Sequence, residues 1–252
     1  MRIGIRFLPF PVIWLSMFWA IALGAAPPVP QGSSRCVVQG RIEILNPKVR
    51  LREVSADSSG VAVWLMPIKG MTKPGPAQMQ KRTLEQRDKR FIPHIMVIQV
   101  GTEVDFPNHD PFFHNVFSVY EGKPFDLGLY ANGESRPVRF NRPGISHIYC
   151  NIHPQMSAVI VTVETPYFAI SAPDGRYSIE NVPAGTYQLH IWHERSEEQQ
   201  LAAQSRIVSV ESPVAELGVI RLDEAGYIPG AHKDKNGQDY DTDRHLPAYR
   251  NP

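Results

Sequence analysis

Residues 145–164 read Ile-Ser-His-Ile-Tyr-Cys-Asn-Ile-His-Pro-Gln-Met-Ser-Ala-Val-Ile-Val-Thr-Val-Glu, and this stretch decides the fold. The apolar, β-branched and aromatic residues at its two ends predict two strands. The loop between these strands must turn the chain back, and Pro154 restricts the conformations that the turn can adopt. We therefore expect Cys150, His153 and Met156 to face one point at the end of a pair of strands.

These three side chains offer a thiolate, an imidazole and a thioether, and a second imidazole, His114, lies upstream. The turn region 108–111 before His114 can place it at the same end of a sandwich. Two His and one Cys with a weak axial Met are the ligand set of a blue-copper site. The soft ligands favour Cu(I), whereas the imidazoles also accommodate Cu(II). Zinc is the competing ion, but its usual sites do not use Met.

Other candidate chemistry is sparse. His109 precedes His114 by five residues and could approach the metal, but the four-ligand set is already full, so we expect a surface turn histidine. We find no Ser/His/Asp motif, no paired carboxylates and no Gly-rich phosphate loop. The sequence therefore predicts a protein that is not an enzyme. A formal net charge of +1 without a basic run also predicts no nucleic-acid partner.

Residues 78–165 resemble a cupredoxin of the plastocyanin/amicyanin type. The matching elements are Phe91-x-Pro93, Val100-Gly-Thr-x-Val-x-Phe-x-Asn108, His114-Asn115-Val116, Pro143-Gly144 and Cys150-x-x-His153-x-x-Met156. The resemblance implies a Greek-key β-sandwich with one type 1 copper ion. It implies that His114, Cys150 and His153 are equatorial ligands and that Met156 is the axial one. It also implies that Asn115 ties the two ligand-bearing segments together by hydrogen bonding, and that electrons pass through His153.

Residues 166–223 resemble a transthyretin-like or carboxypeptidase-regulatory-like domain, a second small Ig/transthyretin-like β-sandwich. The resemblance rests on the run Asp174-Gly-Arg-Tyr-Ser-Ile-Glu-Asn-Val-Pro-Ala-Gly-Thr-Tyr-Gln-Leu-His-Ile-Trp192. Residues 35–72 resemble the opening strands of the same fold. We therefore hypothesise that the cupredoxin is inserted into a split sandwich of 35–72 and 166–223. In the alternative, the strands of 36–67 belong to the cupredoxin, and contacts with the 177–192 strands would favour the split.

Composition agrees with an all-β chain. The 252 residues include 23 prolines and 18 glycines, which favour short strands and turns over long helices. Residues 78–90 could form an edge strand or a short helix, and 122–133 contain several turn residues. From residue 224 to 252 the chain is polar and nearly free of aliphatic residues, which predicts a flexible tail.

The N-terminal sequence predicts an export signal. Arg2 and Arg6 form a basic region, residues 12–23 are almost wholly apolar, and small residues follow. We expect a signal peptide over 1–24, a mature protein in a bacterial periplasm, and no stable membrane span after signal removal. An uncleaved membrane anchor is the alternative, although the apolar run is short for a span.

The two cysteines, Cys36 and Cys150, could form a disulfide in an exported protein. Cys150 is better explained as a ligand, which leaves Cys36 as a buried lone thiol. We therefore predict a periplasmic type 1 (blue) copper protein that carries single electrons to or from a redox partner protein, such as a periplasmic dehydrogenase or cytochrome. The alternatives are a copper-handling or copper-sensing protein, and an adhesion or scaffold module with a structural metal.

Overall fold

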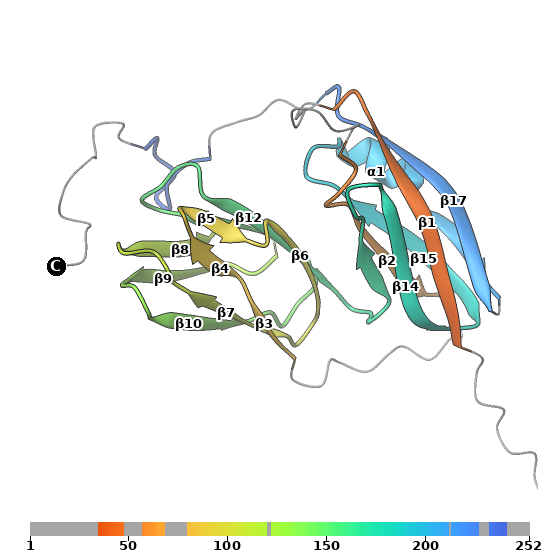
Figure 1. Ribbon diagram of the computed structural model, residues 1–252, viewed down its shortest axis with the longest axis horizontal. Coiled ribbons are helices and arrows are strands. Elements are labelled where there is room, and N and C mark those ends of the chain that lie inside the picture. The colour runs from red at the N-terminus through yellow and green to blue at the C-terminus, as the bar shows by residue number, and fades with distance from the viewer. Residues whose placement is uncertain are drawn as a thin grey trace, which may run out of the picture. The chain divides into compact units, whose positions relative to one another are not determined.

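The computed structural model describes residues 35–47, 57–68, 80–119, 122–211, 213–226 and 232–240. The chain divides into two compact units, Met1–Gly32 and Ser33–Pro252, and all described residues belong to the second. The predicted signal peptide, 1–24, lies outside the described residues. The fold is all-β, as predicted, with one short helix, α1 (Glu198–Gln204), among the described residues (Figure 1). No helix in this part of the chain is long and apolar enough to cross a membrane.

The middle of the chain forms a sandwich that carries the predicted metal ligands. Its larger sheet has five strands in the order β6 (Ile95–Gln99), β12 (Ser157–Val163), β11 (Gly144–Cys150), β8 (His114–Ser118) and β9 (Phe125–Tyr130). A smaller sheet has the order β10 (Ser135–Arg139), β7 (Glu103–Pro107) and β3 (Lys81–Thr83), and β4 (Glu85–Arg87) pairs with β5 (Arg90–Ile92). Residues 78–90, which the sequence left open, thus contribute strands.

Strand β9 was not predicted, because its region is rich in turn residues. Gly128 lies within it at φ +67°, a conformation that suits glycine. The strand is the edge of its sheet and pairs only with β8. Glycine weakens a strand interior, but an edge strand with an antiparallel partner tolerates it.

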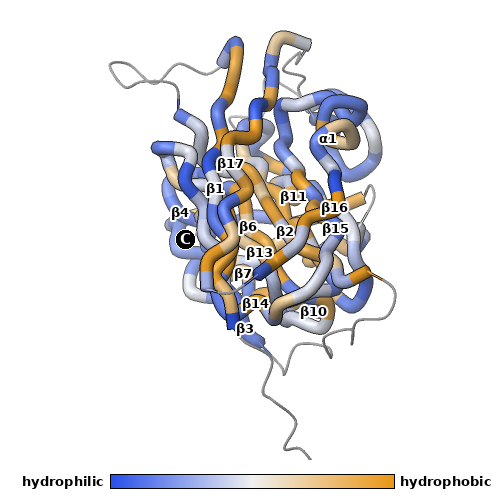
Figure 2. Tube along the Cα trace, turned by 90° about the vertical axis from the view of Figure 1, so that its right-hand side faces the viewer, coloured by the Kyte–Doolittle hydropathy of each residue, from blue (hydrophilic) through white to orange (hydrophobic). Residues whose placement is uncertain are grey.

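One hydrophobic cluster fills the inside of this sandwich. It consists of Leu84, Phe91, Met96, Ile98, Val104, Phe106, Val116, Tyr130, Val138, Phe140, Ile148, Cys150, Met156, Ala158 and Ile160. Two of the predicted ligands, Cys150 and Met156, therefore belong to the core. A further cluster covers the other face of β12 and β6 with Ala62, Val97, Val159, Val161 and Val163. Burial on both faces explains why β12 reads as a continuous apolar run instead of an alternating pattern. The hydrophobic colouring along β2 and β6 in Figure 2 follows the same burial.

The remaining strands form two sheets with a separate core. One has the order β14 (Arg176–Pro183), β1 (Arg35–Leu45) and β17 (Val214–Asp223). The other has the order β13 (Phe168–Ile170), β2 (Ala62–Pro67), β15 (Gly185–Trp192) and β16 (Arg206–Val210). β1 pairs with β14 and β17, and β2 pairs with β13 and β15. These are the contacts between the early and late strands that the split-sandwich hypothesis requires, and the domain division itself stays a prediction.

The turn before β14 shows why this sequence needs a glycine at position 175. Gly175 has φ +80°, and a Cβ at this position would lie 2.0 Å from the carbonyl oxygen of Ile42. The Gly175 carbonyl accepts a hydrogen bond from the Ile42 amide at 2.8 Å. Any larger residue would therefore separate the start of β14 from β1.

The segment 224–252 differs from the predicted flexible tail in the parts that the structure describes. Glu224 is buried and bonds His193. Residues 232–240 contact Cys150 and Asn151, at the start of the loop that carries the predicted metal ligands. Residues 241–252 lie outside the described residues.

Candidate metal centre

The structure brings three of the predicted ligands together. Cys150 Sγ lies 3.6 Å from His114 Nδ1 and 3.8 Å from His153 Nδ1, and the two Nδ1 atoms are 3.2 Å apart. No other group of His, Cys, Asp or Glu donor atoms converges in this way in the described part of the chain. Such separations suit atoms that each bond one ion at about 2.0–2.3 Å. The donor set and its spacing therefore fit a transition metal.

Strand pairing determines this convergence. Cys150 is the last residue of β11 and His114 is the first residue of β8, and these two strands are neighbours with Cys150 opposite Val116. The loop between β11 and β12 is closed by a hydrogen bond from the Met156 amide to the His153 carbonyl at 3.0 Å. The loop therefore returns His153 to the end of the sheet where the other two ligands lie.

Met156, the predicted axial ligand, is buried in the same core cluster as Cys150. Its carbonyl accepts a hydrogen bond from the Cys150 amide at 3.3 Å, which brings the two ends of the loop together. The role of its sulfur as a ligand stays a prediction.

Asn115 connects the two ligand-bearing segments through its backbone. Its carbonyl accepts a hydrogen bond from the Asn151 amide at 3.1 Å, and its amide faces the Cys150 sulfur. Its side-chain Nδ2 instead donates to Asp126 Oδ1 at 2.6 Å. The hydrogen bond between the two segments is therefore made by the main chain of Asn115 and not by its side chain.

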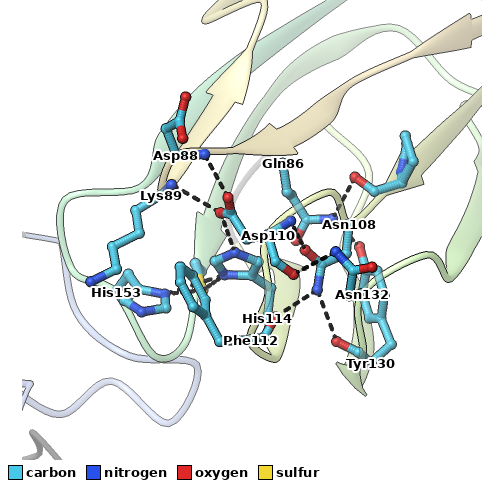
Figure 3. Close-up of polar contacts among 12 residues, drawn as sticks. Gln86, Asp88, Lys89, Asn108, Asp110, Phe112, His114, Tyr130, Asn132 and His153 are labelled. Atoms are coloured by element: carbon cyan, nitrogen blue, oxygen red, sulfur yellow. Dashed lines mark hydrogen bonds and ion pairs between the residues drawn. The ribbon is translucent and has the colours of Figure 1, made fainter. Parts of the chain in front are cut away.

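One partner of the site, Asp110, was not predicted from the sequence. Its Oδ2 lies 2.9 Å from His114 Nε2, and both side chains are buried (Figure 3). This bond fixes the ring so that Nδ1 faces Cys150 and His153. Metal-bound histidines usually donate their other ring nitrogen to such a carboxylate or carbonyl, which also increases their basicity as ligands.

A tight turn between β4 and β5 holds that carboxylate. Asp88 and Lys89 both have φ +54°, as in a type I′ hairpin turn, and their amides donate to Asp110 at 2.6 and 2.9 Å. Asn108 Oδ1 accepts the Asp110 amide at 2.9 Å. The signal was present in the sequence as Asn108-x-Asp110 followed four residues later by His114, but the stretch was assigned only as a turn.

The protonation of the ligands favours metal binding at neutral pH. Burial lowers the pKa of His114, with Asp110 opposing, and burial together with the charge of His114 lowers the pKa of His153 to about 4. Both imidazoles are therefore neutral and can offer a lone pair. Burial raises the pKa of the Cys150 thiol, while the backbone amides of Asn115, Ile152 and His153 oppose that shift. A bound metal ion removes the thiol proton.

His153 is the ligand nearest to solvent. Its residue is partly buried, whereas Cys150 and His114 are fully buried. The Phe112 ring lies 5.3 Å from the His114 ring and 5.5 Å from the His153 ring, and the Lys89 ammonium lies 5.3 Å from the centre of Phe112 (Figure 3). One aromatic side chain and one cationic side chain therefore lie beside the exposed edge of the site.

The other residues considered from sequence lie elsewhere. His109 has a side chain that is 41% exposed and lies 3.9 Å from Glu85. Cys36 is buried in the core cluster of the β1–β17 strands, and no disulfide joins it to Cys150. Burial of the Cys36 thiol was predicted and is confirmed.

The chain was compared with known proteins. No protein-family model matches it, and no curated protein matches it. Solved structures of cupredoxins match about a third of the chain. A copper-containing nitrite reductase from Thermus scotoductus SA-01 is 28% identical over 39% of this chain and 25% of its own, with a TM-score of 0.32. This chain thus matches only a quarter of the length of that enzyme.

Two smaller proteins match over almost their whole length. A purple cupredoxin from Nitrosopumilus maritimus is 22% identical over 32% of this chain and 98% of its own, with a TM-score of 0.30. A mutant of amicyanin in its Cu(I) state is 16% identical over 36% of this chain and 96% of its own, with a TM-score of 0.31. The similarity is therefore to a cupredoxin-sized part of this chain.

The prediction that the chain is not an enzyme is overturned by this comparison. One of the similar structures is an enzyme, the copper-containing nitrite reductase. The prediction rested on the absence of hydrolytic and phosphate-binding motifs. That absence says nothing about redox enzymes, because a copper site needs none of those motifs.

Proposed function

We propose that this chain is an exported type 1 (blue) copper protein that transfers single electrons, with one resident copper ion held by His114, Cys150, His153 and Met156. The observation that carries the proposal is the convergence of Cys150 Sγ and two His Nδ1 atoms within 4.8 Å. Copper, when bound, supplies reversible one-electron exchange between Cu(I) and Cu(II). The N-terminal sequence supports export to the periplasm.

The chain's own groups prepare the site for this exchange. Asp110 holds the His114 ring in one orientation, and backbone amides face the Cys150 sulfur. Such fixed ligands reduce the rearrangement that accompanies a change in oxidation state. The core around Cys150 excludes water, and the His153 edge remains the route to a redox partner protein, for which a periplasmic dehydrogenase or cytochrome is a suitable class.

Burial of the ligands favours a resident ion over a transported one. Cys150, His114 and Met156 are each 0% exposed, so another protein cannot reach the ion through these three ligands. A copper-handling protein needs ligands that a recipient can reach. An adhesion or scaffold module with a structural metal would show no redox cycling with a partner.

The decisive experiment adds Cu(II) to the metal-free protein and records the visible spectrum. We expect an intense blue thiolate-to-copper charge-transfer band that Cys150→Ser abolishes. Cys36→Ser is the matched control, because it removes the other buried thiol, and it should leave the band unchanged. A colourless copper complex of the wild-type protein would reject the proposal.

Met156 has a separate test. Met156→Leu should retain the blue colour and raise the reduction potential, because a weak axial bond tunes the potential without holding the metal. Spectroelectrochemistry measures this shift. Loss of all copper binding in this variant would show that the axial role is misassigned.

A further inference from the structure

A polar segment distant in sequence, residues 232–240, contacts the metal-ligand loop. The hydroxyl of Tyr240 donates a hydrogen bond to the carbonyl of Cys150 at 2.7 Å. The same hydroxyl oxygen lies 3.2 Å from His232 Nδ1. Because the single hydroxyl proton goes to the carbonyl, His232 Nδ1 is the donor of this second bond, and it shares its hydrogen with the Lys233 carbonyl at 3.1 Å. Tyr240 thus contacts the peptide of Cys150, a predicted copper ligand, and His232 contacts Tyr240.

Tyr149, the residue before Cys150, also contacts this segment. The ring of His232 stacks on the ring of Tyr149 with centroids 4.0 Å apart and planes inclined by 20°. Tyr240 packs edge-on against His232 at 5.1 Å. The three rings therefore form one contiguous aromatic group beside the end of β11.

Lys235 extends the contact to both ligand-bearing segments. Its backbone amide donates to Asn151 Oδ1 at 2.9 Å, just after Cys150. Its ammonium lies 2.7 Å from Asp126 Oδ2, and Asp126 also accepts the Asn115 side-chain amide, just after His114. The segment is therefore connected to residues adjacent to two of the ligands.

The segment has a turn structure of its own. The Asp234 carboxylate accepts the amides of Asn236 and Gln238 at 2.9 and 2.8 Å, and Gly237 adopts φ +79°. Lys233 and Asp239 form a solvent-exposed ion pair on the outside of this turn, of a kind that adds little to stability. This turn fixes the spacing between His232, Lys235 and Tyr240, so the three contacts form as a unit.

We propose that residues 232–240 are a clamp on the metal-ligand loop, and that Tyr240 is a positioning residue that fixes the Cys150 peptide. The inference rests on the proposed copper site. Fixing the carbonyl of Cys150 restricts the backbone from which its sulfur projects, and Lys235 restricts the next residue. The clamp therefore slows opening of the loop, the motion that would release the ion. The hydrogen bond from Tyr240 also withdraws electron density from the Cys150 peptide, which disfavours the more positive Cu(II) state.

The experiment uses the full chain with three single substitutions. Tyr240→Phe removes only the hydroxyl and Lys235→Met removes only the ion pair with Asp126. Lys233→Met is the matched control, because it removes a lysine of the same segment that pairs with Asp239 and not with the ligand loop. The first readout is the rate at which a bathocuproine chelator captures Cu(I) from each loaded protein.

We expect capture to be about fivefold faster for Tyr240→Phe and for Lys235→Met, and unchanged for Lys233→Met, from the usual contribution of one hydrogen bond or ion pair. The potential of Tyr240→Phe should fall while its blue band remains. The second readout needs no metal: amides of the ligand loop in the metal-free protein should exchange hydrogen faster in the two clamp variants.

The outcomes separate the clamp from the copper site. A wild-type protein without a blue band rejects the proposed function, yet the amide-exchange comparison still tests the clamp. A blue wild type whose Tyr240→Phe and Lys235→Met variants match it in capture rate and in amide exchange rejects the clamp. An equal acceleration by Lys233→Met would also reject it, because the effect would then come from charge alone.

Discussion

His114 and His193 are both buried histidines whose Nε2 lies 2.9 Å from a buried carboxylate oxygen, but only His114 faces the other proposed metal ligands. The second ring nitrogen of His114 lies close to Cys150 Sγ and His153 Nδ1. The second ring nitrogen of His193 is buried, and it has no hydrogen-bond partner among the described residues. A histidine–carboxylate pair therefore fixes a ring without determining its chemistry, which depends on what faces the other nitrogen.

The two carboxylates are also compensated differently. Asp110 is held by two backbone amides in addition to His114, so no full positive charge contacts it. Glu224 accepts His193 and also the guanidinium of Arg195, at 2.8 Å. The first arrangement leaves the carboxylate charge for the histidine, as a metal site requires. The second neutralises the charge with an arginine, as a structural buried ion pair requires.

The largest effect is expected when the His114 ring, whose Nδ1 faces Cys150 and His153, is removed. His114→Ala removes one equatorial donor and should reduce copper affinity by more than about 100-fold, beyond the loss typical for a mere partner of a ligand. His193→Ala is the matched control and should leave copper affinity unchanged. Competition with a chelator measures both. Equal copper affinity of His114→Ala and wild-type protein would remove His114 from the site.

The second prediction concerns the stability of the other pair. Glu224→Ala leaves the buried His193 without its partner, whereas Arg195 keeps Glu194, and the change should lower the free energy of unfolding by about 2 kcal/mol. The copper spectrum should not change. Urea denaturation measures the loss, with Glu180→Ala, an exposed strand carboxylate, as a control expected to stay within about 0.5 kcal/mol. If Glu224→Ala is no more destabilising than the control, the ion pair adds nothing to stability.

The contrast also shows what the sequence could reveal. The convergence of Cys150 and His153 was predictable because their spacing within one loop forces them together, and the strands around them follow from alternation and β-branched residues. Asp110 was not predictable as a partner. Its role depends on a hairpin turn at Asp88 and Lys89, distant in sequence, whose amides orient it.

The clamp and the His193 pair escaped prediction for a related reason. Polarity across 224–252 predicted a flexible tail, but Glu224, Lys235 and Tyr240 each make specific contacts to residues far along the chain. A few well-placed polar groups suffice to dock a segment that lacks an apolar stripe. Helix α1 was missed because seven residues are too few to show a helical period.

The third prediction tests the role of the Asp110 carboxylate beside the proposed metal site. Asp110→Asn keeps the size of the side chain and removes its charge, so it should weaken copper binding by about 10- to 100-fold while the blue band persists. Chelator competition measures the affinity, and Asp105→Asn, a substitution on β7, is the control. A blue band lost in Asp110→Asn would mean that the carboxylate holds the site together and does not merely orient His114.

The smallest expected effect is the pH dependence of His193. Burial lowers the pKa of His193 below its usual value, with Glu224 opposing. Below about pH 6.5 the unfolded chain therefore binds a proton that the folded chain does not, and stability falls as the pH decreases toward the folded pKa. Urea unfolding of the metal-free protein between pH 7.5 and pH 5.5, chosen as about one unit on either side of that value, measures this slope. His193→Gln should make the slope shallower without abolishing it, because His114 and His153 have lowered pKa values too. An unchanged or steeper slope would mean that Glu224, and not burial, controls the protonation of His193, and the two histidine–carboxylate pairs would then differ in charge as well as in neighbours.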